Sequence, residues 1–124
     1  MVTSGPILKH PSPAIEKDWL RPGAYGSAVD FDSYWNGEAL AQMDCISTDD
    51  HAQFRYYKSV GYFQQTPDPY ADLGELVAGL KPGRMDEKER TLAINLGLAL
   101  DDMAVAPTIY QQAKEKGLGI WLSL

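Results

Sequence analysis

The aspartates that follow short apolar runs are the side chains of this 124-residue sequence best placed to do chemistry. Asp32 closes the run from Tyr25, whose small apolar centre is typical of a buried parallel strand that delivers side chains to a site at its carboxyl end. Burial raises the pKa of a carboxyl group, which would equip Asp32 for proton transfer. The simpler interpretation is a turn or helix-cap aspartate beside Ser33, and from spacing alone we favour it.

The adjacent residues Asp49, Asp50 and His51 raise the question of a metal site. Three neighbouring side chains cannot all point at one ion, so a helix cap is the better interpretation and no metal site is predicted. His10 lies in a proline-rich loop and is expected to be solvated rather than catalytic. Cys45 lies inside a predicted strand with no histidine partner in the sequence, so we interpret it as a small core residue rather than a nucleophile.

The elements that must position these side chains alternate between strand and helix. A strand end at residues 2–4 precedes strands at 25–32 and 45–48 and helices at 38–43, 51–62 and 70–80. Asn36 or Ser33 is expected to cap the first helix, and Asp49 or Asp50 the second. This β-α-β-α order predicts a parallel sheet with right-handed crossovers. We therefore expect an α/β fold: a partial (half) Rossmann-like parallel sheet of about three strands, with flanking helices and a long C-terminal helix.

The last third of the chain is predicted to form one helix from Asp86 to Gly117, kinked by Pro107. Apolar residues recur on two of its faces at steps of three and four. One face carries Leu92, Leu96, Ala99, Met103, Ala106 and Tyr110, and the other carries Ile94, Leu98, Val105 and Ile109. A helix with two apolar faces needs a cover on both sides.

Length and composition limit the domain organisation and the partners. The 124 residues are expected to fold as a single domain, with the sheet segment in residues 1–63 and the loop, short helix and long helix in residues 64–124. A net charge of −6 argues against a nucleic-acid partner, because such sites are clusters of Lys and Arg. The single cysteine fits a reducing compartment, so we expect a cytoplasmic protein, and no window is apolar enough for a membrane span.

Several collinear strings carry a family resemblance over nearly the whole chain. The residues 70–84, YADLGELVAGLKPGR, strongly resemble the C-terminal part of the ornithine cyclodeaminase and μ-crystallin family. Upstream, TSGPIL at 3–8, WLRPG at 19–23 and AVDFD at 28–32 are similar to the family's middle Rossmann strands and loops. Downstream, INLGLALDDM at 94–103 is similar to its returning helix.

The resemblance implies a Rossmann domain that binds NAD(P), with the last long helix crossing back to a dimerising substrate domain. Family members include an ornithine cyclodeaminase that releases ammonia, cyclic-imine reductases, amino-acid dehydrogenases and a thyroid-hormone-binding protein. The aspartate that ends the Ala-Val strand is implied as the acid/base group and corresponds to Asp32. Positions along the cofactor correspond to Thr3, Ser4, Val29, Asn95 and Leu96. The second apolar face of the long helix then becomes a predicted interface.

Two parts of the family pattern have no counterpart in these residues. The sequence contains no Gly-x-Gly-x-x-Gly turn and no acidic residue about 20 positions after one to hold a ribose. The family's first half, with its substrate-binding Lys and Arg residues, is also absent. We therefore expect a truncated relative without stand-alone catalysis that forms a homodimer through its strand edge, its C-terminal helix or both. The alternative is an NAD(P)-dependent cyclodeaminase, imine reductase or dehydrogenase that works when the first half is supplied.

Overall fold

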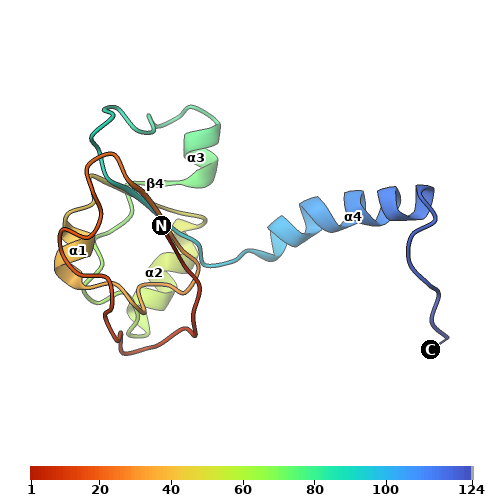
Figure 1. Cartoon of the computed structure of the whole chain (residues 1–124), viewed down its shortest axis with the longest axis horizontal. Coiled ribbons are helices and arrows are strands. Elements are labelled where there is room, and N and C mark those ends of the chain that lie inside the picture. The colour runs from red at the N-terminus through yellow and green to blue at the C-terminus, as the bar shows by residue number, and fades with distance from the viewer. Residues whose placement is uncertain (124) are drawn as a thin grey trace.

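A five-stranded parallel sheet with flanking helices forms the folded body, and one helix projects from it (Figure 1). The structure, a computed structural model, describes residues 1–123. In chain order the elements are β1 (Val2–Thr3), β2 (Tyr25–Ala28), α1 (Gly37–Ala41), β3 (Cys45–Thr48), α2 (His51–Ser59), β4 (Ala71–Asp72), α3 (Leu73–Val77), β5 (Thr91–Ile94) and α4 (Ala99–Glu115).

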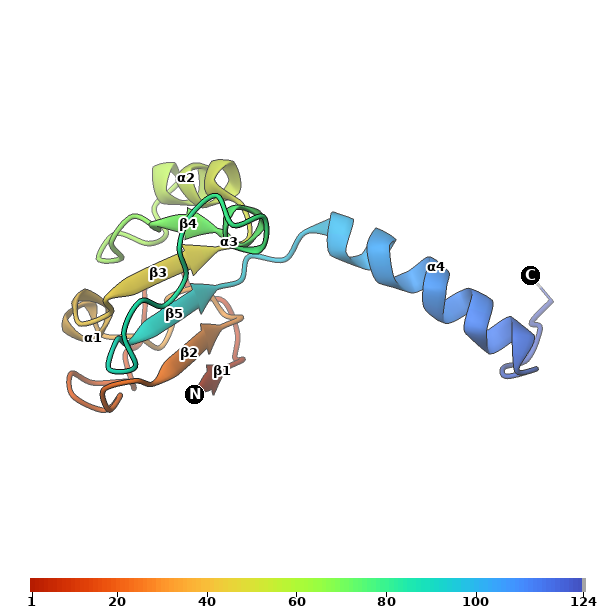
Figure 2. The same ribbon diagram turned by 90° about the horizontal axis from the view of Figure 1, so that it is seen from above.

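The strand order is β1-β2-β5-β3-β4, and every neighbouring pair is parallel, so all the arrows in Figure 2 point the same way. The central strand β5 pairs four residues with β2 on one side and four with β3 on the other. The predicted α/β, Rossmann-like parallel sheet is confirmed, with five strands in place of about three. Its two edges are β1 and β4.

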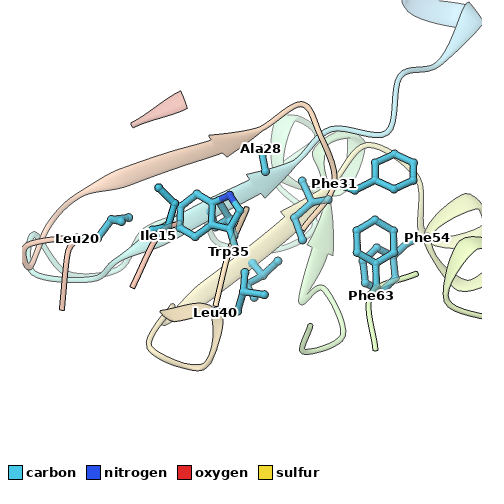
Figure 3. Close-up of a cluster of buried hydrophobic side chains, with 11 residues drawn as sticks. Ile15, Leu20, Ala28, Phe31, Trp35, Leu40, Phe54 and Phe63 are labelled. Carbon is cyan, nitrogen blue, oxygen red and sulfur yellow. The ribbon is translucent and has the colours of Figure 1, made fainter. Parts of the chain in front are cut away.

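One face of the sheet carries the main core, because successive residues of a strand point to opposite faces. Ala28, Leu92 and Ile94 share this face, where they pack with the other seven residues labelled in Figure 3 and with Ile46. A Cβ added at Gly26 would lie 2.9 Å from the Leu92 side chain and 3.1 Å from the Trp35 ring. Glycine at this position therefore lets the indole lie directly on the sheet.

The prediction of one helix from Asp86 to Gly117 is wrong. Thr91–Ile94 is the central strand, and Gly97, with φ +83°, separates it from α4, which begins at Ala99. A four-residue apolar run cannot be told from a helix by periodicity alone, and Leu92 shares the three-and-four spacing of the helix that follows. Pro107 lies within α4, which buries no side chain. Of the residues assigned to the two apolar faces, Leu92 and Ile94 therefore lie in the core of the sheet, whereas those within α4 are exposed.

Local signals placed most other elements. The strand at 45–48 is confirmed, and Asn36 and Asp50 cap α1 and α2 through their side chains, as expected. The strand expected at 25–32 stops at Ala28, and the helix expected at 70–80 is preceded by β4. No helix among residues 1–123 has both the length and the apolar composition that crossing a bilayer requires.

Candidate functional site

The carboxyl ends of the five strands meet at one edge of the sheet, and the turn that leaves β2 there carries the candidate acid/base residue. Phe31, in the middle of this turn, has a left-handed backbone with φ 61°. Its ring packs against Tyr57, Tyr62 and Phe63 with centroids 4.8–5.5 Å apart. Left-handed backbone is unfavourable for a bulky residue and persists where packing fixes it. The aromatic cluster therefore holds the turn that positions Asp32.

The Asp32 carboxyl is buried, with 2% of the residue exposed. Its Oδ2 accepts a hydrogen bond from the Thr66 hydroxyl at 2.8 Å, whereas Oδ1 has no partner among the described residues. Burial raises the pKa of this carboxyl above its ordinary value, although hydrogen bonds from Thr66 and from nearby backbone oppose the shift. Asp32 caps no helix, because Asn36 caps α1. Of the two simpler interpretations from spacing, the turn residue therefore agrees with the structure and the helix cap does not.

A cavity of about 290 Å³ lies beside Asp32. Its other lining residues are Lys9, His10, Pro11, Pro13, Trp35, Gly61, Phe63, Gln64 and Gln65. The walls combine apolar rings with a few polar groups, which is the usual composition of a small-molecule site. His10 is exposed on this wall, as expected from its proline-rich loop.

Asp30 is a second buried aspartate of the same turn, and sequence reasoning missed it. Its carboxylate accepts hydrogen bonds from the Thr3 hydroxyl at 2.6 Å and from the Gly5 N–H at 2.9 Å. The Trp35 Nε1 in turn donates to the Thr3 oxygen at 3.1 Å. Asp30 thus fastens the N-terminal segment to the sheet, and Thr3 is used structurally. The available signal was the spacing of two, which places Asp30 and Asp32 in one turn.

The other family-implied positions lie along the same edge of the sheet. The Asn95 N–H donates to the Ala28 carbonyl at 2.8 Å, and its side-chain amide donates to the Ser27 hydroxyl at 2.9 Å. The Val29 N–H donates to the Thr3 carbonyl at 3.0 Å, with the Val29 side chain half exposed.

Asp49 accepts hydrogen bonds from the backbone where the chain leaves the sheet after β5. One of its carboxylate oxygens accepts from the backbone N–H groups of both Leu96 and Gly97 at 2.8 Å. This use of Asp49, 47 positions from Leu96, was not visible from the local sequence.

The structure does not join all of the implied residues into one pocket. Thr3, Ser4, Val29, Asn95 and Leu96 do not line the cavity beside Asp32, and within residues 1–123 no hydrogen bond links them to that carboxyl. Ser4 is exposed. The acid/base candidate and the implied cofactor positions are therefore two separate parts of one sheet edge.

A metal-like grouping of His51, Asp72 and Glu75 lies near the end of β4, with ligand atoms within 4.8 Å of one another. Its oxygens already have partners. Asp72 and Glu75 form a reciprocal capping box at the start of α3, and Lys81 Nζ lies 3.0 Å from Glu75 Oε2. A neighbouring ammonium group disfavours a cation, so we assign no metal to these residues.

Among residues 1–123, the N-termini of α1, α2 and α3 are capped by side chains, whereas that of α4 is not. Helix N-termini at a sheet edge bind phosphates when their N–H groups are free. Here the side chains of Asn36, Asp50 and Asp72 already accept hydrogen bonds from the N-termini of α1, α2 and α3, and two of the three are carboxylates that repel phosphate. These helices therefore offer no pyrophosphate site.

Comparisons with known proteins agree on one family. Residues 1–117 match the model of the ornithine cyclodeaminase/mu-crystallin family. The chain is 34% identical over 119 residues to N-((2S)-2-amino-2-carboxyethyl)-L-glutamate dehydrogenase from Staphylococcus aureus, covering 90% of this chain and 35% of that protein. It is 29% identical over 127 residues to alanine dehydrogenase from Archaeoglobus fulgidus, covering 96% and 38%. The chain thus spans little more than a third of the length of these relatives.

Solved structures agree with the sequence comparison. The Thermococcus litoralis Δ1-pyrroline-2-carboxylate reductase, in complex with NADH and L-proline, superposes with a TM-score of 0.67 at 25% identity, covering 89% of this chain and 37% of that one. An archaeal alanine dehydrogenase dimer with bound NAD gives a TM-score of 0.70 at 26% identity, covering 99% and 40%.

Proposed function

Because the chain belongs to the ornithine cyclodeaminase/mu-crystallin family, we propose that its 124 residues form only the acid/base side of the family's site, and are inactive alone. In this proposal the chain is a truncated relative that persists as a self-associating α/β domain in the cytoplasm. Two observations support the lack of stand-alone catalysis. The N-termini of α1, α2 and α3 are occupied by side chains, and the cavity beside Asp32 is separate from the implied cofactor positions.

The exposed helix α4 is the observation that carries the self-association. Val105 and Ile109, which belong to the second apolar face that is the predicted interface, lie one turn apart on α4. Val105 is 54% exposed and Ile109 is 60% exposed. A helix of 17 residues with no packed face is marginal by itself in water, so it requires a partner surface. The edge strand β1 offers a second surface, because one side of it is unpaired in the described sheet.

Sedimentation velocity at micromolar concentration tests the self-association. We expect a dimer for the wild-type chain and a monomer for Ile109→Glu, which places a charge within the second apolar face of α4. Ala104→Glu is the matched control, because Ala104 is also exposed but lies on a different side of the helix. A compact wild-type monomer, or equal dissociation by both substitutions, would contradict the proposal.

The second candidate function is enzymatic, and the buried Asp32 carboxyl favours it. We propose that Asp32 acts as the acid/base group of an NAD(P)-dependent cyclodeaminase, imine reductase or amino-acid dehydrogenase when the family's first half is supplied by another chain. A buried carboxyl with a raised pKa and an unpartnered oxygen beside a cavity is suited to proton transfer.

A complementation assay separates the two candidates. The chain is mixed with the first half of the Archaeoglobus alanine dehydrogenase, and reduction of NAD is followed at 340 nm with alanine as substrate. Activity that appears only in the mixture and disappears in Asp32→Asn supports the enzymatic candidate. In the absence of the first half, we expect neither NADH nor NADPH to raise the melting temperature of the chain, whereas a true ligand would.

A further inference from the structure

One face of the sheet is only partly covered by this chain. Successive side chains of a strand point to opposite faces, and the main core lies on the face of Ala28. Tyr25 therefore points to the opposite face, as does Val29, whose N–H continues the ladder to β1. Val2 of β1 pairs with Ser27 in register and shares that face. The exposed fractions of Val2, Tyr25 and Val29 are 68%, 54% and 50%, and we call these three side chains the open face.

Helix α3 covers the rest of the same face. Figure 2 shows it beside β3 and β4, at the other end of the strand order from β1. A cavity of about 160 Å³ beneath α3 is lined by Leu73 and Leu76 of this helix and by side chains of β2, β3 and β5, Tyr25 among them. The open face therefore lies between α3 and the edge strand β1.

The open face and α4 lack the same thing, an apolar cover. Parallel sheets are stable when helices cover both of their faces. Among residues 1–123, α4 buries no side chain, and its two apolar faces are exposed: Val105 and Ile109 on one, Met103 and Tyr110 on the other. With 17 residues it is about 26 Å long, more than the roughly 13 Å of the four-residue strand β2. One such helix can therefore cover the open face along its whole length.

The exit from β5 keeps α4 away from the sheet of its own chain. The Asn95 N–H donates to the Ala28 carbonyl, and the Asp49 carboxylate accepts from the next two backbone N–H groups. These bonds fix most of the segment in which the chain would have to reverse, and α4 runs on away from the body (Figures 1 and 2). A two-fold axis beyond this edge would bring each α4 onto the sheet of the other copy, pointing back along its strands. Helices pack in this direction in β-α-β units.

The exposed area favours a second copy of the chain as the partner. Seven large apolar side chains on the two surfaces are at least half exposed: Val2, Tyr25, Val29, Met103, Val105, Ile109 and Tyr110. At roughly 80 Å² each, one helix on one open face would bury roughly 550 Å², and two reciprocal contacts roughly 1,100 Å². A specific interface needs about 1,000 Å², so a single contact is too small and a symmetric pair is sufficient.

We propose that two copies of the chain exchange α4, so that each helix lies on the open face of the other copy, beside its α3. The inference rests on the proposed function, because it names the surface that the self-association uses. It assigns to Tyr25 and Val29 a role in dimer formation that neither the acid/base site nor the main core requires.

Sedimentation velocity of sheet-face variants tests this surface. Tyr25→Glu places a charge on the open face without touching α4, and it should weaken the dimer at least about tenfold, because an unpaired carboxylate is costly inside an interface. Tyr56→Glu is the matched control, because Tyr56 is a tyrosine of α2 that is 62% exposed and lies outside the open face. Its dimer should equal that of the wild type.

Cross-linking places α4 on the open face without introducing a charge. Two chains of different tag length, each with Cys45→Ser to remove the native thiol, are mixed and treated with a short bismaleimide. One carries Val29→Cys and the other Val105→Cys. We expect a mixed dimer from this pair and at least about tenfold less when Ala104→Cys replaces Val105→Cys, because Ala104 lies on a different side of α4.

The outcomes separate this inference from the proposed self-association. A wild-type dimer that Tyr25→Glu and Tyr56→Glu leave equally intact, or equal cross-linking through Val105→Cys and Ala104→Cys, would overturn the exchange of α4 and leave self-association standing. A wild-type monomer would overturn both. A chain carrying Val29→Cys and Val105→Cys together that cross-links within itself at every concentration would show α4 folded onto its own sheet, and would overturn the second copy as the partner.

Discussion

Replacing Thr66 by Val tests whether the side-chain hydrogen bond to Asp32 controls the pKa of that carboxyl and the stability of the fold. The substitution keeps the shape of the side chain and removes the hydroxyl that donates to Asp32 Oδ2 at 2.8 Å. Both residues are buried, and the substitution would leave Oδ2, like Oδ1, without a side-chain partner. Leaving a buried acceptor unsatisfied costs about 1–3 kcal/mol. At about 4 °C per kcal/mol for a domain of this size, the melting temperature should fall by roughly 4–12 °C.

The pH dependence makes this prediction more specific. The Thr66 hydrogen bond lowers the pKa of Asp32 against the larger effect of burial, so its loss should raise the pKa of Asp32 further. The destabilisation should therefore be larger above the pKa of Asp32 than below it. Urea unfolding at several pH values measures the first effect, and carbon-13 NMR of the Asp32 carboxyl measures the second. Thr66→Ser keeps a hydroxyl and should restore most of both. A Val variant with unchanged stability and an unchanged Asp32 titration would refute the reasoning.

Three further predictions concern carboxyl groups. Burial raises the pKa of Asp32 above its ordinary 3.8, so folding favours the protonated carboxyl. The stability that the protonated carboxyl contributes is therefore complete below pH 3.8 and is lost as the pH rises through the raised pKa. Asp32→Asn should therefore gain stability relative to the wild type over that interval in urea titrations, and a relative loss would contradict this. Asp30→Ala, which removes the acceptor of two hydrogen bonds, should cost about 1.5–3 kcal/mol and speed hydrogen exchange of the Val29 N–H, whereas Asp30→Asn should keep part of the protection. The pKa of Glu75 lies at about 2, below its ordinary 4.5, and the largest cause is the hydrogen bond from the backbone N–H of Asp72. The stability that ionised Glu75 contributes to the fold is therefore present above pH 4.5 and is lost as the pH falls toward 2. Circular dichroism should show the wild type and Glu75→Gln converging in stability across this acid range, and parallel curves would contradict it.

The parts of the fold that depend on local chemistry could be predicted from the sequence. Asn36 and Asp50 are short polar residues at the start of helical segments, and both cap the helices expected of them. The strand Cys45–Thr48 is bounded by aspartates and was placed correctly. Such signals depend on residues within one turn of each other, so they survive without knowledge of the tertiary structure.

The central strand could not be predicted in this way. Thr91–Ile94 has sheet neighbours on both sides and has three consecutive buried residues, so it lacks the polar alternation that marks a half-exposed strand. Its apolar residues continue in step with those of α4, and the pattern therefore favoured a helix. Gly97 was the available boundary signal.

The candidate site, like the fold, could be predicted from the sequence only in part. Asp32 was recognisable from its place after a short apolar run, yet its burial and its partner are tertiary properties. Thr66 lies 34 residues away in the sequence, and Lys9 lines the same cavity from a loop with no regular structure. The sequence therefore indicated one candidate group, and the structure was required to find the surroundings that shift its pKa.

The attachment of α4 has a mechanical consequence. The helix is joined to the body through β5, and the Asp49 carboxylate clamps the backbone at this exit. Because β5 lies in the middle of the sheet, tension applied to α4 is transmitted into the ladders with β2 and β3 together, along the strand direction. Both ladders must then shear at once, whereas a helix hung from an edge strand would unzip one ladder bond by bond. A partner that pulls on this helix therefore pulls against the strongest part of the sheet, and the body should hold its shape under the load.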